Sequence, residues 1–253
     1  MQISWQPLRN ELALWRRDNR SVAFWWRDDD AIKPTPALER LSNASVTAGM
    51  PVHIAVIPAA ATQALADHVA EQAHLVPMVH GWAHANHAPD TAKKAEFGSP
   101  REAAASELQR GMDRLSQLFT DQLVPVFVPP WNRMDRGFLP LLAATGFCAV
   151  STFGRAPKDQ ILPFINSHLD PVDWRGTRGL HDPDLLISRA VTELQARRTD
   201  PTPDDEPFGF LTHHLVHDDQ IWDFCAGFIA EMLDGAAKPL QLDHHLETTH
   251  EPT

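Results

Sequence analysis

The chain has 253 residues, of which 43% are hydrophobic and 22% charged, so it can bury a full core as one large domain or two small ones. Its formal net charge of -11 disfavours nucleic acid and anionic membranes as partners, because both need a basic surface. With two cysteines, no charged and apolar leader segment, and no apolar run of about 20 residues, we expect a cytoplasmic protein without a disulfide scaffold.

Short apolar runs alternate with amphipathic stretches along the chain, which predicts strands and helices in turn. Strands are expected at residues 21–26, 52–57, 75–79, 123–128, 147–152, 161–167 and 208–212. Helices are expected at about residues 6–18, 34–49, 62–73, 99–119, 138–144, 182–198 and 221–233.

This alternation is typical of a parallel sheet with helices outside it, either as a barrel or as a doubly wound sheet. No break in composition separates two halves of the chain. We therefore expect a single domain, with a core at about residues 20–237 and a polar tail at 238–253.

Polar side chains gather directly after five of the predicted strands. In a parallel barrel all strands end on one face, and that face carries the active site. Five polar clusters at five strand ends therefore favour an enzyme. The clusters are Asp28 with Asp29 and Asp30, His80 with His84, Trp131 with Asn132, Asp170 with Asp173, and His213 with His214.

The histidine pair is the clearest candidate for metal binding. His80 and His84 are four residues apart, as neighbours on one face of a helical turn are, and neutral imidazole is the commonest metal ligand among side chains. A carboxylate from residues 28–30 would complete a hydrolytic, zinc-type site. Gly81 stands where a His-Glu-x-x-His protease carries its glutamate, and no nucleotide-binding glycine motif or Gly-x-Ser-x-Gly segment is present.

Taken in order, the five clusters resemble the motifs of the polysaccharide deacetylase family, the NodB-homology carbohydrate esterases, over about residues 23–218. The resemblance implies an α/β fold, an irregular (β/α)7 barrel comparable with larger parallel barrels. The family motifs are Thr-Phe-Asp-Asp-Gly, His-x-x-x-His, Arg-x-Pro-Trp/Tyr, Asp-x-x-Asp-Trp and Leu-x-His. The similar segments here are 26–30, 80–84, 128–131, 170–174 and 211–213.

The resemblance implies that Asp29, His80 and His84 hold one divalent metal ion, for which Zn²⁺ is the expected occupant. An open coordination position would admit water, as in catalytic zinc sites. The neighbouring Asp28 would be the general base. Because Asp30 stands where the family has glycine, the register is open, and Asp29 as base with Asp30 as ligand is the competing assignment.

For the remaining catalytic roles, the resemblance implies that His213 protonates the departing amine and that the backbone N–H of Trp131 stabilises the oxyanion. His214 and His217 are adjacent alternatives to His213. Asp173 either orients a catalytic group or only caps its own turn.

Two further features leave alternatives open. The arginine that pairs with the base in the family is Val128 here, and Arg27, Arg133 or Arg175 could substitute for it. The aromatic rings near the strand ends could stack on a sugar or simply fill the top of the barrel. These rings belong to Trp82, Trp131 and Trp174.

We therefore expect a metal-dependent hydrolase that removes an N-acetyl or similar acyl group from an amino sugar or oligosaccharide. A related amidohydrolase that cleaves a small non-sugar C–N bond is the alternative within enzymes. A metal-free barrel that binds glycans without hydrolysing them is the alternative outside enzymes. The partner is a carbohydrate or a small amide, and the oligomeric state stays open.

Overall fold

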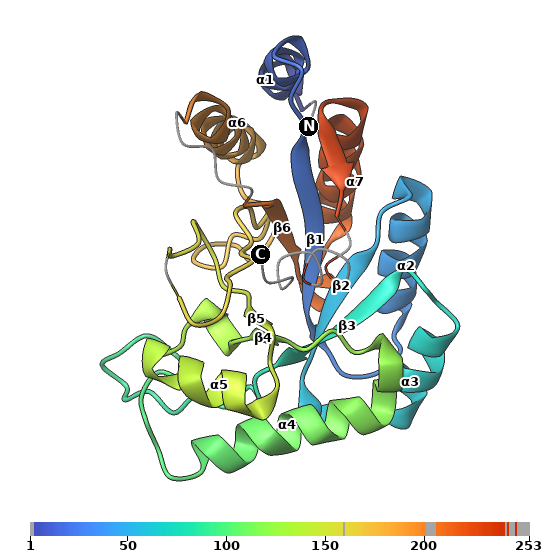
Figure 1. The fold of residues 1–253 in the computed structure, drawn as a ribbon. Coiled ribbons are helices and arrows are strands. Elements are labelled where there is room, and N and C mark those ends of the chain that lie inside the picture. The colour runs from blue at the N-terminus through green and yellow to red at the C-terminus, as the bar shows by residue number, and fades with distance from the viewer. Residues whose placement is uncertain (1–2, 159, 201–205, 241, 243–245, 247–253) are drawn as a thin grey trace.

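The computed structural model describes residues 3–158, 160–200, 206–240, 242 and 246. Its centre is a seven-stranded parallel sheet in the order β5-β4-β3-β2-β1-β6, with β7 paired to the start of β1 (Figure 1). The strands are β1 (Val22–Ala31), β2 (Val52–Val56), β3 (Leu75–His80), β4 (Val126–Val128), β5 (Ala149–Val150), β6 (Phe208–Thr212) and β7 (Ala237–Pro239).

Helices follow most of the strands and surround the sheet in Figure 1. Several begin at a side chain that caps the first turn: the hydroxyls of Thr35 and Thr62 accept from backbone N–H groups of α2 and α3, and Asp218 caps α7 in the same way. The helices are α1 (Gln6–Arg17), α2 (Pro36–Ala48), α3 (Gln63–Ala70), α4 (Ala104–Phe119), α5 (Leu139–Thr145), α6 (Pro183–Thr199) and α7 (Asp219–Asp234).

The predicted α/β architecture is confirmed: the parallel sheet curves into a half-barrel covered by helices. The strand predicted at residues 161–167 is wrong, because this segment makes only isolated bridges to β5 and its continuation. The reason lies in Asn166, whose side-chain oxygen accepts from Thr152 N–H at 2.7 Å and whose amide donates to Gly154 O at 2.9 Å. The Thr152 N–H thus bonds a side chain and not the facing backbone, although backbone bonds such as Ser167 N–H to Thr152 O still join the two segments.

Several strands differ from the sequence expectation, and β4 and β5 are shorter than the predicted 123–128 and 147–152. The first strand was expected to end at residue 26, but β1 continues to Ala31 and carries all three aspartates. The short β7 was not predicted, and it puts Lys238 and Pro239 in the sheet. Leu242 and Leu246 are also buried and Leu240 is partly buried, whereas the remaining residues of the predicted tail lie outside the described residues. In the described part of the chain, no helix is long and apolar enough to cross a membrane.

The two faces of the sheet bury different clusters. Phe24 and Trp26 of β1 point to the large cluster between sheet and helices, whereas Trp25 belongs to a small cluster on the concave side. This alternation is that of any strand, with successive side chains on opposite faces. Extended through β1, it puts Arg27 and Asp29 on the concave face with Trp25, and Asp28 on the helix-covered face.

Candidate active site

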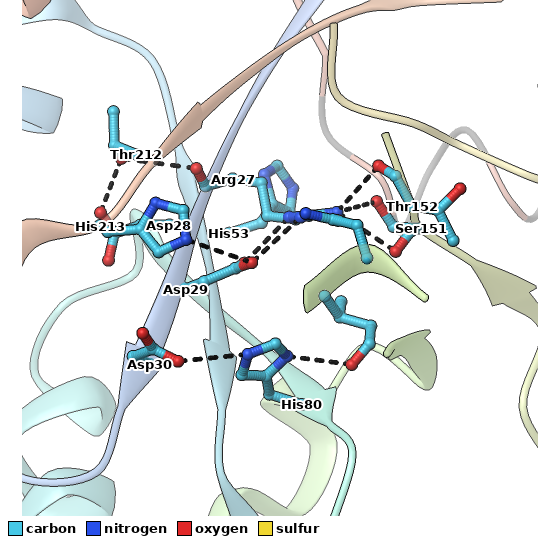
Figure 2. A network of polar contacts seen from close by, with 12 residues as sticks. Arg27, Asp28, Asp29, Asp30, His53, His80, Ser151, Thr152, Thr212 and His213 are labelled. Atoms are coloured by element: carbon cyan, nitrogen blue, oxygen red, sulfur yellow. Dashed lines mark hydrogen bonds and ion pairs between the residues drawn. The ribbon is translucent and has the colours of Figure 1, made fainter. Parts of the chain in front are cut away.

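Three candidate metal ligands meet at the ends of β1 and β3. Oδ1 of Asp30 lies 3.3 Å from Nε2 of His80 and 3.4 Å from Nε2 of His84, and Figure 2 shows the first of these contacts. The three ligand atoms all lie within 4.8 Å of one another. Oδ1 of Asp30 is buried and accepts no hydrogen bond from the described residues. A buried oxygen that faces two imidazole nitrogens suits a divalent cation.

Asp30 reaches the histidines because the strand is irregular at that point. The register of β1 against β2 shifts between Asp28 and Ala31, and Asp30 has a φ of +76°. Such a bulge re-aims a side chain relative to strict alternation. The structure therefore places Asp30, the ligand of the competing assignment, against His80 and His84, whereas Asp29, the ligand expected first, pairs with Arg27 beside them.

The environment of His80 orients its ring towards Asp30. Its Nδ1 donates to the carbonyl oxygen of Val128 at 3.0 Å, which leaves Nε2 to face Asp30. Burial opposes the charged form of His80, but Asp29 and Asp30 outweigh it and raise its pKa. Burial likewise opposes ionisation of Asp30, but contact with His80 and the nearby His213 and His84 hold its pKa well below its usual range.

Asp29 lies beside this triad and is held by Arg27. The guanidinium contacts both carboxylate oxygens, with Nε 2.9 Å from Oδ1 and Nη2 3.0 Å from Oδ2. Both residues are buried on the concave face of β1, and Figure 2 shows them side by side. The hydrogen bond from Nη2 and the close ion-pair contact of Nε together orient the carboxylate.

The other donors of Arg27 are also used. Nη1 donates to the Ser151 hydroxyl at 2.8 Å and to the carbonyl oxygens of Ser151 and Thr152, both at 3.2 Å. Nη2 also donates to Oδ1 of Asn132 at 2.5 Å. Of the three arginines that could replace the missing third-motif arginine, the structure brings Arg27 to the carboxylate, while the Val128 side chain packs in the concave cluster.

His213 stands at the end of β6, between two carboxylates. Its Nε2 lies 3.9 Å from Oδ2 of Asp29, and its Nδ1 lies 3.8 Å from Oδ2 of Asp170. The Trp174 ring lies against the His213 ring at 4.7 Å, and its Nε1–H donates to Oδ2 of Asp170 at 2.8 Å. Burial raises the pKa of Asp170, although His213 and the Trp174 N–H act in the opposite direction.

This arrangement was compared with known proteins. No family model matches the chain, and no curated protein matches it by sequence. Among solved structures, a Mycobacterium smegmatis protein assigned to the polysaccharide deacetylases superposes with a TM-score of 0.65 at 19% identity, covering 89% of each chain. A family 4 acetyl xylan esterase from Clostridium thermocellum, in complex with a cobalt ion, gives 0.54 at 12% identity, covering 91% of this chain and 93% of that one.

The chain has the fold of the family 4 carbohydrate esterases. The same fold also occurs in a family 4 pseudoenzyme, a mutant of which has restored enzymatic activity. That mutant superposes with a TM-score of 0.58 at 12% identity, covering 89% of this chain and 68% of that one. The fold alone therefore does not decide whether a chain is active, and the side chains at the strand ends must carry that argument.

Asp28, expected as the general base, does not face the metal triad in this esterase fold. Its side chain is fully buried, and it accepts from the Thr212 hydroxyl at 2.6 Å, from His214 N–H at 3.0 Å and from His214 Nδ1 at 2.5 Å. Burial opposes ionisation, but His214 and Thr212 outweigh it and lower the pKa of Asp28. The carboxylate joins the ends of β1 and β6 and is not exposed to a substrate.

Asp173 and Trp82 do not lie where their expected functional roles would place them. Asp173 accepts from the backbone N–H groups of Gly176 and Thr177 at 3.0 and 3.1 Å, so it caps its own turn, and Asp170 is the motif-four carboxylate beside His213. Trp82 packs against the main core, with the Arg110 guanidinium of α4 4.4 Å from its ring centre. These contacts turn the Trp82 ring towards α4.

Two expected aromatic residues do lie at the site. Trp131, in the short helix η3 (Pro130–Asn132), has a φ of +58°, and its ring lies 4.3 Å from that of His84. Trp174 is 42% exposed beside His213. Ser151 and Thr152, which hold Arg27, were missed by the sequence reasoning, because a hydroxyl and two carbonyls after a short strand carry no signal of their own.

Proposed function

We propose that this chain is a divalent-metal-dependent hydrolase that removes an acetyl or similar acyl group from an amino sugar or oligosaccharide. The observation that carries the proposal is the convergence of Asp30, His80 and His84 beside Asp29 and His213. A metal-ligand set and two proton-transfer groups at one end of a barrel are the components that amide hydrolysis needs.

In this proposal Asp30, His80 and His84 hold the ion. A bound divalent ion of this kind polarises a carbonyl oxygen and lowers the pKa of water towards about 7. Two imidazoles and one carboxylate leave coordination positions open, as in catalytic rather than structural zinc sites. Zn²⁺ is the first ion to test, and the cobalt ion of the Clostridium enzyme makes Co²⁺ the second.

Asp29 acts as the general base and takes the proton of the attacking water. Arg27 orients this carboxylate through its two contacts. His213 gives its proton to the departing amine, which is a poor leaving group until protonated. Asp170 and the Trp174 ring hold the imidazole. The backbone N–H of Trp131 remains the proposed oxyanion donor.

The half-exposed Trp174 ring offers a flat apolar face next to the acid, where a sugar ring could stack. A related amidohydrolase remains the second candidate, because the same residues can cleave another C–N bond. The non-catalytic glycan-binding barrel is disfavoured, because it has no use for both a metal triad and an acid–base pair.

The test is acetate release from N-acetylglucosamine oligomers by protein reconstituted with Zn²⁺ or Co²⁺. An O-acetylated xylan and a panel of cyclic amides serve as parallel substrates. We expect metal-dependent acetate release that Asp29→Asn lowers by about 10²- to 10⁴-fold. Ring opening of a cyclic amide without acetate release would favour the amidohydrolase. Metal binding without turnover of any substrate would contradict the proposed hydrolase.

A further inference from the structure

Glu96, in the loop between β3 and α4, has a buried carboxylate that binds the backbone of the loop carrying His84. Only 1% of Glu96 is exposed. Oε2 accepts from Trp82 N–H at 3.0 Å, and Oε1 accepts from Ala83 N–H at 2.8 Å and Ala85 N–H at 3.3 Å. Three amides that surround His84 in sequence therefore converge on one side chain.

The loop is shaped around this carboxylate. Gly81 and His84 have φ angles of +57° and +55°, and backbone N–H groups in such left-handed turns form concave sites for anions. A Cβ on Gly81 would lie 2.2 Å from Oε2 of Glu96 and 2.6 Å from the Pro130 ring. The glycine of the His-Gly-Trp-Ala-His segment thus makes room for the carboxylate.

The position of the His84 ring depends on the loop backbone more than the position of the His80 ring does. The His80 ring is held at Nδ1 by the Val128 carbonyl, whereas the His84 ring contacts Asp30, the His80 ring at 5.1 Å and the Trp131 ring at 4.3 Å. A non-glycine residue at positive φ persists only where its surroundings hold it there. The bonds to Glu96 on both sides of His84 supply that restraint.

Glu96 is itself fixed to the core. The next residue, Phe97, is fully buried against Phe127 at 5.4 Å, and its carbonyl accepts from Asp135 N–H at 2.8 Å. The preceding residue, Ala95, donates its N–H to the Asn86 side chain at 3.0 Å. The carboxylate is therefore presented from a rigid segment.

A competing use of the carboxylate is a second metal site, because ligand atoms of His87, Glu96 and Glu107 lie within 4.8 Å of one another. The carboxylates are already engaged, however. The Glu96 oxygens accept three backbone N–H groups, and the Glu107 carboxylate pairs with Arg101. The Glu96 carboxylate therefore binds the loop backbone instead of a second metal ion.

We propose that Glu96 is a positioning residue for the metal centre. Its carboxylate holds the backbone of residues 82–85 so that His84 Nε2 lies beside Asp30 and His80. The inference rests on the proposed function only in taking His84 as a metal ligand. Partners that orient metal ligands typically change metal affinity by about 10- to 100-fold when mutated. We expect a loss of that size for Zn²⁺ when the bonds from Glu96 are removed.

The experiment compares three variants. Glu96→Gln keeps the shape but turns an amide towards the loop N–H groups, and Glu96→Asp keeps the charge but shortens the reach. Glu107→Gln is the matched control, since it removes a buried charge from the same neighbourhood without touching the loop amides. Zn²⁺ affinity is measured by competition with a chelator, and amide hydrogen exchange is followed in a peptide covering residues 80–88.

Both Glu96 variants should bind Zn²⁺ at least about tenfold more weakly and exchange the 82–85 amides faster without metal, while Glu107→Gln matches the wild type in both. A purely structural role would lower metal-free stability and leave the Zn²⁺ affinity of the folded protein unchanged, which would overturn the inference. So would unchanged amide exchange. If the wild-type protein binds no Zn²⁺ while Glu96→Gln still speeds exchange, the proposed hydrolase fails and the restraint by Glu96 is supported.

Discussion

Arg27 and Asp29 face the same way on β1, and two contacts of 2.9 and 3.0 Å join the guanidinium to the carboxylate. In the resembling family pattern this arginine stands at the position of Val128, the last residue of β4 here. In this chain the partner comes from the same strand as the proposed base, two residues away, so strand geometry alone aligns the pair. The three consecutive aspartates therefore have different partners: Asp29 pairs with Arg27, Asp30 faces two histidines, and Asp28 accepts from Thr212 and His214.

Arg27→Met should destabilise the fold, because it leaves Asp29 buried without its cation. Removing one partner of a buried ion pair costs about 3–5 kcal/mol of unfolding free energy. Urea unfolding of the metal-free protein measures this loss. Arg27→Lys keeps the charge but loses the two-pronged contact, so it should fall between wild type and Arg27→Met. A Met variant as stable as the wild type would contradict the pairing.

Asp29→Asn should lower kcat by about 10²- to 10⁴-fold, the usual contribution of a general base, while Zn²⁺ affinity stays close to that of the wild type. The physical reason is that the amide keeps the shape beside Arg27 but cannot take a proton. Steady-state acetate release and chelator competition measure the two effects separately. Wild-type turnover in this variant would remove Asp29 from the mechanism.

Asp28→Asn should lower stability rather than turnover. Both carboxylate oxygens accept bonds from Thr212 or His214, and an amide nitrogen in one of those places would meet another donor. A buried unsatisfied group costs about 1–3 kcal/mol. Thermal and urea unfolding test the stability change. Full stability together with lost turnover would restore Asp28 as the base.

His217 should make the protein less stable as the pH falls below neutrality. Burial lowers its pKa from 6.5 to about 4, with His213 and His214 acting in the same direction and Asp28 and Asp218 opposing. Its neutral Nε2 accepts the His213 N–H at 3.2 Å. The unfolded chain therefore binds more protons than the folded one between pH 6.5 and about 4, so stability is lost across that window as the pH falls.

The His217 contribution is at most about 3 kcal/mol, since one pKa unit corresponds to about 1.4 kcal/mol. Urea unfolding of wild type and His217→Gln at both ends of the window isolates it, because other titrating groups are common to the two proteins. The variant should show the weaker pH dependence. His87→Gln, at an exposed histidine, is the control and should match the wild type. Equal pH dependence in all three would contradict the assignment.

The sequence was sufficient for the architecture and for the expectation that His80, His84 and His213 lie close together, because each stands at or just after the end of a strand with a clear apolar pattern. Alternation could also have separated Asp28 from Asp29: Phe24, Trp26 and Asp28 share one face of β1, and Trp25, Arg27 and Asp29 share the other. This alternation can be used only if the strand is known to continue through the charged residues. Local propensity argues against such a continuation, because aspartate is rare in strands.

Other features depend on tertiary structure alone. The bulge that turns Asp30 towards the histidines has no marker comparable to a glycine, since Asp30 takes a φ of +76° itself. Asn166 takes the Thr152 N–H from the backbone pairing, so an apolar segment predicted as a strand pairs only through isolated bridges. Glu96 is a single acidic residue in a long loop, and only the folded loop shows its carboxylate surrounded by amides.

The most direct test of the account is the Zn²⁺ stoichiometry of three proteins after reconstitution: wild type, Asp30→Ala and Asp29→Asn. Elemental analysis of the purified, dialysed proteins gives the answer without any substrate. The account predicts close to one ion per chain in wild type and Asp29→Asn, and loss of the ion in Asp30→Ala. Retention in Asp30→Ala with loss in Asp29→Asn, or no stoichiometric metal in the wild type, would contradict it.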